Sequence, residues 1–187
     1  TRDSEVLTLL ATIINKLRGS CLEFVPRIFE NTFANTLDMI KVNFTDFPEH
    51  RAAFYSLLAA ITEHCFVTLL QLPAQAFKVV VDSVIWAFHH QERKIADIGL
   101  KMCSDLINNV SRLPVEHQGI SNAFVQAFFL QILQSVFDVL TDTLHKPGFA
   151  SQCEIINLLL QHIVSGRVTV PLWDVSKENY PSNVEFI

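Results

Sequence analysis

An apolar pattern that recurs every 47 or 48 residues is the strongest constraint on how this chain folds. Each copy places large apolar residues four positions apart, the spacing that aligns side chains on one face of an α-helix. The three copies are Phe29, Phe33 and Leu37; Phe77, Val81 and Ile85; and Phe124, Phe128 and Ile132. A helix that returns at this interval predicts stacked helical units of similar size.

Periodic apolar residues predict helices over residues 3–18, 25–43, 48–70, 73–90, 93–111, 120–143 and 151–165. Residues 167–183 read as a loop that leads into an eighth helix. The inward stripe expected for the first helix is Val6, Leu9, Leu10, Ile13, Ile14 and Leu17. Gly19 and Gly166 are the expected stops of the first and seventh helices. Asp46 and Glu49 are expected to form a capping box before the third helix.

Helix pairs at this spacing are typical of the HEAT and armadillo class, whereas tetratricopeptide repeats are shorter, at about 34 residues. The sequence therefore predicts an all-α, HEAT-repeat solenoid segment of about seven antiparallel-paired helices. The expected repeats are residues 1–44, 45–92 and 93–145, with a partial repeat over 146–187 and no domain boundary inside. Because end repeats need a polar outer surface and neither end shows one, we expect a single fragment of a longer array.

Charge and cysteine content limit the partners that this chain can take. The net charge is −5, which gives no basic surface for nucleic acid. Cys21, Cys65, Cys103 and Cys153 lie too far apart in sequence for a zinc motif, and we expect reduced, buried thiols in an intracellular protein. Residues 118–137 carry no charge, but their amides and their one-sided apolar pattern argue against a membrane helix.

Lys78, Asp82 and His89 fall on one stripe of the fourth helix and are the candidate partner-facing residues. The alternative is an ordinary solvated stripe, or an Asp82 bonded to a neighbouring repeat. Trp86 lies among apolar residues and is expected to pack between helix layers, although a binding anchor is the other possibility.

Catalytic, cofactor and metal sites are not expected. The chain has no P-loop, G-x-S-x-G or G-x-G-x-x-G motif. Adjacent residues diverge on a helix, so neither His89-His90 nor His64-Cys65 forms a metal or nucleophile pair. We therefore expect a binding protein and no enzyme. An all-α enzyme would need a cleft with clustered titratable groups.

Short motifs in a fixed order carry a family resemblance. They are Phe47-Pro48-Glu49-His50-Arg51, His64-Cys65-Phe66, Phe77-Lys78, Asp82-Ser83, Ile85-Trp86-Ala87-Phe88, Ala96-Asp97 with Gly99-Leu100, Thr141-Asp142-Thr143 and, upstream, Ala11-Thr12-Ile13 with Asn15-Lys16-Leu17. In this order and spacing the chain resembles the exportin-1 family of karyopherins, in the importin-β superfamily. The resemblance extends to about Gly166 and falls in the family's carboxy-terminal HEAT-repeat region.

The resemblance implies a segment of a nuclear export receptor that shuttles between nucleus and cytoplasm. Its partners would be Ran-GTP, cargo with a leucine-rich nuclear export signal and, through the full-length protein, nucleoporins. The segment would be structural and allosteric, since the family's export-signal groove and reactive cysteine lie in earlier repeats. The second helix of each pair would line the inner surface, and no nucleic acid or membrane contact is implied. The alternative is a HEAT scaffold of another karyopherin or of a phosphatase.

Overall fold

The computed structural model describes residues 2–187, with side chains from Ser4 onward, and every regular element among them is a helix. This confirms the predicted all-α class, and the succession of helices fits a HEAT-type segment. The chain divides into two compact units, one ending at Asp105 and the other running from Leu106 to Ile187. The division falls inside α6 (Arg93–Ser111).

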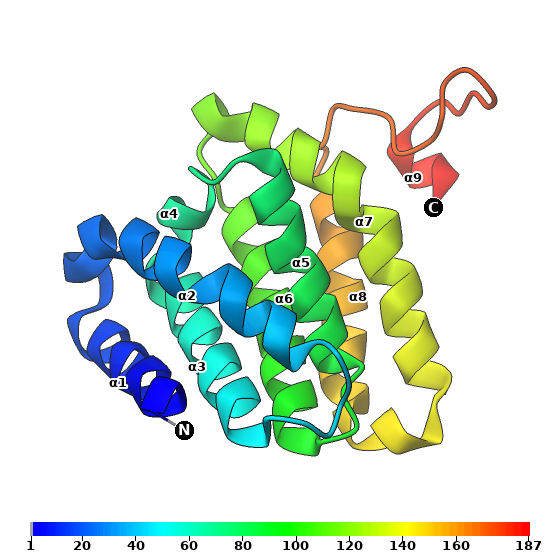
Figure 1. Ribbon diagram of the computed structural model, residues 1–187. Helices are drawn as coiled ribbons and strands as arrows, with labels where there is room; N and C mark the ends of the chain where they lie inside the picture. The colour runs from blue at the N-terminus through cyan, green and yellow to red at the C-terminus, as the bar shows by residue number, and fades with distance from the viewer. Residues whose placement is uncertain (1) are drawn as a thin grey trace. The chain divides into compact units, whose positions relative to one another are not determined.

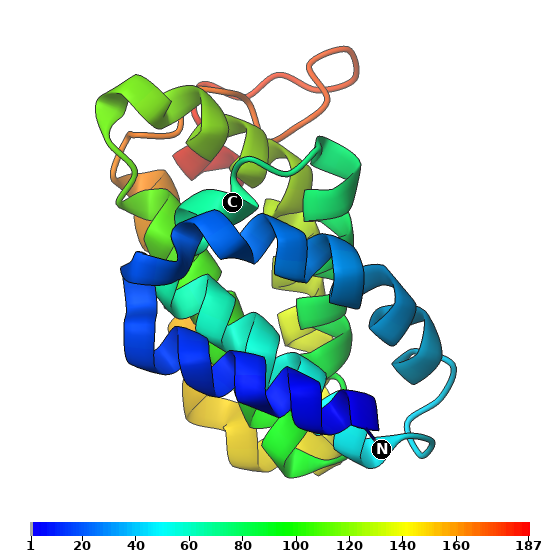
Figure 2. The same cartoon turned by 60° about the vertical axis from the view of Figure 1, so that its left-hand side comes forward.

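The first unit is built around a central helix, α3 (Pro48–His64). Around it lie α1 (Arg2–Leu17), the 3-10 helix η1 (Arg18–Phe24), α2 (Val25–Ile40), the short α4 (Phe66–Leu69), α5 (Ala74–Phe88) and the first part of α6. Both α1 and α2 pack on α3 (Figures 1 and 2). The rings of Phe29 and Phe33 in α2 stack at 4.1 Å between centroids, and Phe33 meets Phe54 of α3 at 5.2 Å.

The second unit pairs α7 (Gln118–Thr141) with α8 (Phe149–Val164). The 3-10 helices η2 (Val115–His117) and η3 (Thr143–Gly148) precede them, and the single turn α9 (Asn183–Phe186) follows a loop. A buried contact of 2.9 Å joins Ser121 Oγ of α7 to His162 Nε2 of α8. Burial and the nearby Arg167 lower the pKa of His162, which favours the neutral imidazole. Gly166 ends α8 with a φ of 72°, as predicted.

Side-chain hydrogen bonds attach the loop that follows α8 to the rest of the second unit. The Arg167 guanidinium donates to the carbonyls of Ser111 and Leu113, at the end of α6. The amide of Asn183 donates to Val170 O at 2.9 Å and accepts from Leu172 N at 3.1 Å. These contacts order a segment that has no helical period.

The buried face of α1 differs from the prediction. Leu7, Ala11 and Ile14 are buried, with Ser4, whereas Val6, Leu9, Ile13 and Leu17 are 46%, 58%, 39% and 52% exposed. Large apolar residues lie on more than one side of α1. The sequence alone therefore does not show which of these sides packs against a neighbouring helix. The narrower face, with its small Ala11, packs against α3.

Two predicted helix ends are also wrong. Arg18, with a φ of 50°, takes the left-handed conformation, and Gly19 continues into η1. No capping box precedes α3, because Phe47 occupies the N-cap with a φ of 55° and no side chain caps the helix. The side-chain oxygen Oδ1 of Asn43 accepts instead from the backbone amides of Thr45 and Asp46, at 2.9 and 2.7 Å.

Two expectations from composition can be compared with the structure, one on the uncharged stretch in α7 and one on the four cysteines. Val115–Thr141 is the one stretch among the described residues that is long and apolar enough to cross a membrane, and 39% of its most apolar window is buried. Of the residues that the helical period places inward, Phe124, Phe128, Ile132 and Val136 are buried and Leu140 is half-buried. All four cysteines are free, but Cys153 is exposed on α8, so the expectation of burial is wrong there.

Candidate partner-facing surface

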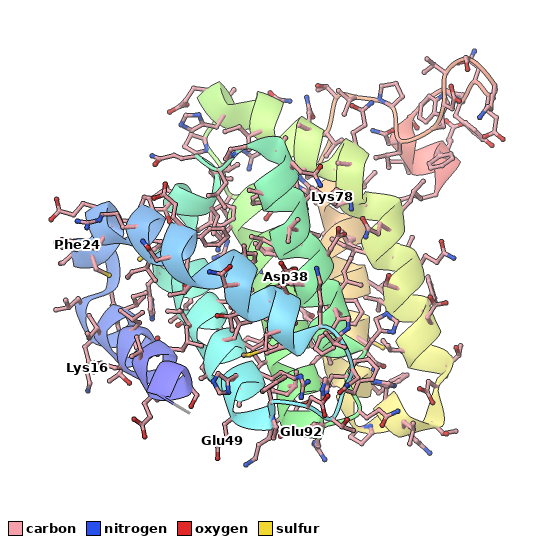
Figure 3. All side chains as sticks on the ribbon, viewed as in Figure 1. Lys16, Phe24, Asp38, Glu49, Lys78 and Glu92 are labelled. Carbon is pink, nitrogen blue, oxygen red and sulfur yellow. The ribbon has the colours of Figure 1, made fainter. Side chains whose placement is uncertain are left out.

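Two of the three candidate residues, Lys78 and Asp82, lie on α5 and form an ion pair, and the third directly follows the helix. Lys78 Nζ lies 2.5 Å from Asp82 Oδ2, and the two side chains are 48% and 39% exposed. Lys78 projects from α5, and Asp38 lies on the neighbouring α2 (Figure 3). His89 follows the last residue of α5, where its half-buried ring stacks on Phe88 at 5.1 Å. The stripe therefore consists of an ion pair at one end and an imidazole about 10 Å further along.

Aromatic rings hold the side of α5 that faces α3. Trp86 stacks on Tyr55 of α3 at 6.1 Å and 15°, and meets Phe44 at 4.8 Å. The Tyr55 hydroxyl donates to the Ser83 carbonyl at 3.1 Å, and its burial raises the phenol pKa well above its ordinary value. Trp86 is half-buried in this ring cluster, which agrees with its expected packing role. The cluster sets the rotation of α5 and so the direction of its polar stripe.

Arg51 is buried in the same region and organises the loop between α2 and α3. Its guanidinium donates to four backbone carbonyls, those of Ile40, Asn43, Phe44 and Asp46, at 3.1, 2.7, 3.2 and 2.6 Å. Burial lowers the Arg51 pKa, yet an arginine keeps its charge in a folded protein. The sequence motif contained Arg51, but no local pattern indicated that its partners are carbonyls earlier in the chain.

The Arg51 guanidinium also lies over the Trp86 ring, 5.6 Å from the ring centroid. This cation–π contact links the loop to α5 without a carboxylate. Together with the carbonyl bonds it joins α2, α3 and α5 through one side chain.

His90 turns inward, away from the solvent stripe. Its Nδ1 accepts from the Glu92 backbone amide at 2.8 Å, and its Nε2 is buried. Burial and the charge of Arg51 lower the pKa of His90. His89 and His90 therefore point to different surroundings, and no group of three His, Cys, Asp or Glu suited to a metal gathers in the part of the chain that the structure describes.

On another side α5 meets α6 with almost no gap. A Cβ at Gly99 would lie within 3 Å of the Phe88 nitrogen and of the Ala87 carbonyl carbon. Nearby, Lys101 Nζ bonds Glu63 of α3 at 2.7 Å, and this bond holds the pKa of Glu63 below its ordinary value. Because both side chains are about half exposed, the pair adds little to stability. The close backbone contact is the stronger restraint on α5.

Comparison with known proteins assigns the family. The family model described as CRM1 C terminal matches residues 1–187, the whole of the chain. Protein EXPORTIN 1A of Arabidopsis thaliana is 46% identical over 188 residues, which is 100% of this chain and 17% of that protein. Exportin-1 of Dictyostelium discoideum is 40% identical over 187 residues, again 100% of this chain and 17% of that protein.

Exportin-1 of Schizosaccharomyces pombe is 42% identical over 176 residues, which is 94% of this chain and 16% of that protein. The chain thus spans only 16% to 17% of the length of these relatives. A family match over all residues, with identities at this level, shows that the chain belongs to the CRM1 C-terminal family, the carboxy-terminal region of exportin-1.

Proposed function

We propose that the chain is a structural and allosteric arc of a nuclear export receptor that binds Ran-GTP and cargo with a leucine-rich export signal. The observation that carries the proposal is the family match over all 187 residues. The receptor works by binding, not by catalysis, and shuttles between nucleus and cytoplasm with nucleoporins among its partners. The exportin names of the relatives favour this role over that of a phosphatase scaffold or another HEAT scaffold.

Allostery of this kind needs a rigid element that partners can contact. In our proposal the second helix of each pair, which includes α2, α5 and α7, faces Ran-GTP or cargo. Within the first unit, α5 meets the requirement for rigidity, because Trp86, Arg51 and Gly99 hold it while Lys78 and Asp82 remain half exposed. Two ligands that favour the same curvature of the array raise each other's affinity.

Charge reversal on α5 tests the partner-facing stripe. In the full-length protein, Lys78→Glu and Asp82→Lys should each weaken binding of Ran-GTP or of cargo by about 3- to 10-fold, because a complementary charge becomes a repulsive one. Stability should barely change, since an exposed i, i+4 pair contributes only about 0.3–0.5 kcal/mol. Calorimetric titration measures the affinity, and a thermal melt checks the fold.

The matched control is the i, i+4 pair Arg93–Asp97 on α6, a first helix of a pair. Arg93→Glu should leave both affinities unchanged. The exchanged double variant Lys78→Asp with Asp82→Lys keeps an ion pair, so it should still bind weakly if partners contact the stripe. Wild-type affinity in all α5 variants would show that Lys78 and Asp82 are merely solvated, and would leave the receptor function itself intact.

A further inference from the structure

Two buried thiols lie unusually close together in the first unit. Cys21 Sγ and Cys65 Sγ are 3.9 Å apart although 44 residues separate them in sequence. Their exposed fractions are 2% and 0%. Neither is used by the partner-facing stripe, and the sequence had indicated only that these thiols are reduced and buried.

Both sulfurs approach the same acceptor. Cys21 Sγ donates to the Arg18 carbonyl at 2.8 Å, and Cys65 Sγ lies 3.7 Å from that oxygen. A shared acceptor keeps the two thiols pointing toward one another. A disulfide needs about 2.0 Å between sulfurs, so the pair has to close by roughly 2 Å.

The backbone at both cysteines is irregular, which permits a movement of this size. Cys21 lies in η1, a 3-10 helix whose hydrogen bonds are weaker than those of an α-helix. It follows Arg18, which has a positive φ. Cys65 lies at the break between α3 and α4, with φ −131° and ψ 30°, outside the helical region. A cysteine within a regular helix would not have this freedom.

We propose that Cys21 and Cys65 are a redox modification site, a dithiol that hydrogen peroxide converts to an intramolecular disulfide. In the first step the Cys21 sulfur attacks a peroxide oxygen, the O–O bond breaks, and the product is a sulfenic acid with one water. In the second step the Cys65 sulfur attacks the sulfenic sulfur, the S–O bond breaks, and a second water leaves. Two thiols are oxidised, and one hydrogen peroxide is reduced to two waters.

Burial makes the reaction slow and its product durable. Burial, followed by the hydrogen bond with Cys21, raises the pKa of Cys65 to about 12, so its thiol stays protonated until the site opens. Opening η1 exposes Cys21. Phe24, at the end of η1, already points into solvent and is 53% exposed (Figure 3). Once formed, the disulfide links η1 to the α3–α4 junction and is buried at the same position as the two thiols.

Peptide mapping of the full-length natural protein tests the proposal. The native protein is treated with hydrogen peroxide, its remaining thiols are blocked, and it is digested with trypsin without reductant. Trypsin releases Cys21 in peptide 19–27 and Cys65 in peptide 52–78. We expect a linked species of these two peptides that disappears after dithiothreitol. We also expect backbone amide exchange in η1 to slow by about tenfold in the oxidised protein.

The other cysteines provide internal controls. Cys103 is buried in α6 and should stay reduced, whereas Cys153 is exposed and should oxidise without a link to Cys21. In Cys65→Ser the exchange in η1 should become insensitive to peroxide, and Cys103→Ser should behave as wild type. Sulfinic or sulfonic acid at Cys21 without the linked peptide, or reduced Cys21 and Cys65 after Cys153 has fully reacted, would overturn the proposal.

Discussion

Replacing Arg51 by methionine should lower the free energy of local unfolding of the α2–α3 loop by about 3 kcal/mol. The methionine keeps most of the volume but leaves four carbonyls, among them those of Ile40 and Asn43, without their donor. Loss of a charged donor from a buried acceptor is among the most destabilising kinds of single change. Amide hydrogen exchange of residues 41–47 and of α5, measured in the full-length protein, gives this free energy.

A lysine at the same position separates charge from geometry. Arg51→Lys keeps the positive charge but cannot present the planar fork that reaches carbonyls on both sides, so we expect about half of the methionine effect. Arg93→Met, at an exposed position of α6, should change exchange by less than about 0.5 kcal/mol. If Arg51→Met exchanged like wild type, the guanidinium would not be holding the loop.

Gly99→Ala should destabilise the α5–α6 contact by about 3 kcal/mol, against the usual helix preference. Alanine is normally favoured over glycine inside a helix by about 1 kcal/mol. Here the added methyl group meets the backbone of Phe88 and Ala87, which cannot rotate away as a flexible side chain could. The measurement is again the free energy of opening from amide exchange, in peptides that cover α5 and α6.

Gly119→Ala is the matched control for this substitution. Gly119 lies at the second position of α7, and apart from its chain neighbours and the nearby backbone of α7 itself, no atom lies within 4 Å of the place where its Cβ would stand. The same chemical change should therefore be neutral or stabilising by up to about 1 kcal/mol. Equal effects at both glycines would contradict the close packing of α5 on α6.

Apolar residues recur at helical spacing along most of the helices, and this period located them. The period predicts a helix over residues 93–111, which form α6 with the same bounds. Its expected inward residues are Ile95, Ile98, Met102, Leu106 and Val110, and all are buried except Ile98, which is half-buried. The prediction for α1 failed because that helix has two apolar faces, and only the neighbouring α3 decides which one is buried. The third predicted helix, residues 48–70, is interrupted at Cys65, and the spacing of its apolar residues does not predict this break.

The candidate surface was predictable only in part. The i, i+4 spacing of Lys78 and Asp82 predicted that they share a face, and they form an ion pair. The partners of Arg51 and the approach of Cys21 to Cys65 could not be foreseen, since each depends on segments far apart in sequence that only the fold brings together. The family could nevertheless be predicted from the sequence. That prediction rests on many short motifs in a fixed order, and it does not require knowledge of any single contact.

The most direct test of the receptor role is the affinity of the full-length protein for a fluorescent leucine-rich export-signal peptide, with and without Ran-GTP. We expect Ran-GTP to tighten peptide binding by about tenfold or more, within the range of coupling energies known for linked sites. The isolated chain of 187 residues should bind both ligands weakly or not at all, as expected for one arc of the receptor. A peptide affinity that Ran-GTP leaves unchanged in the full-length protein would contradict the export function.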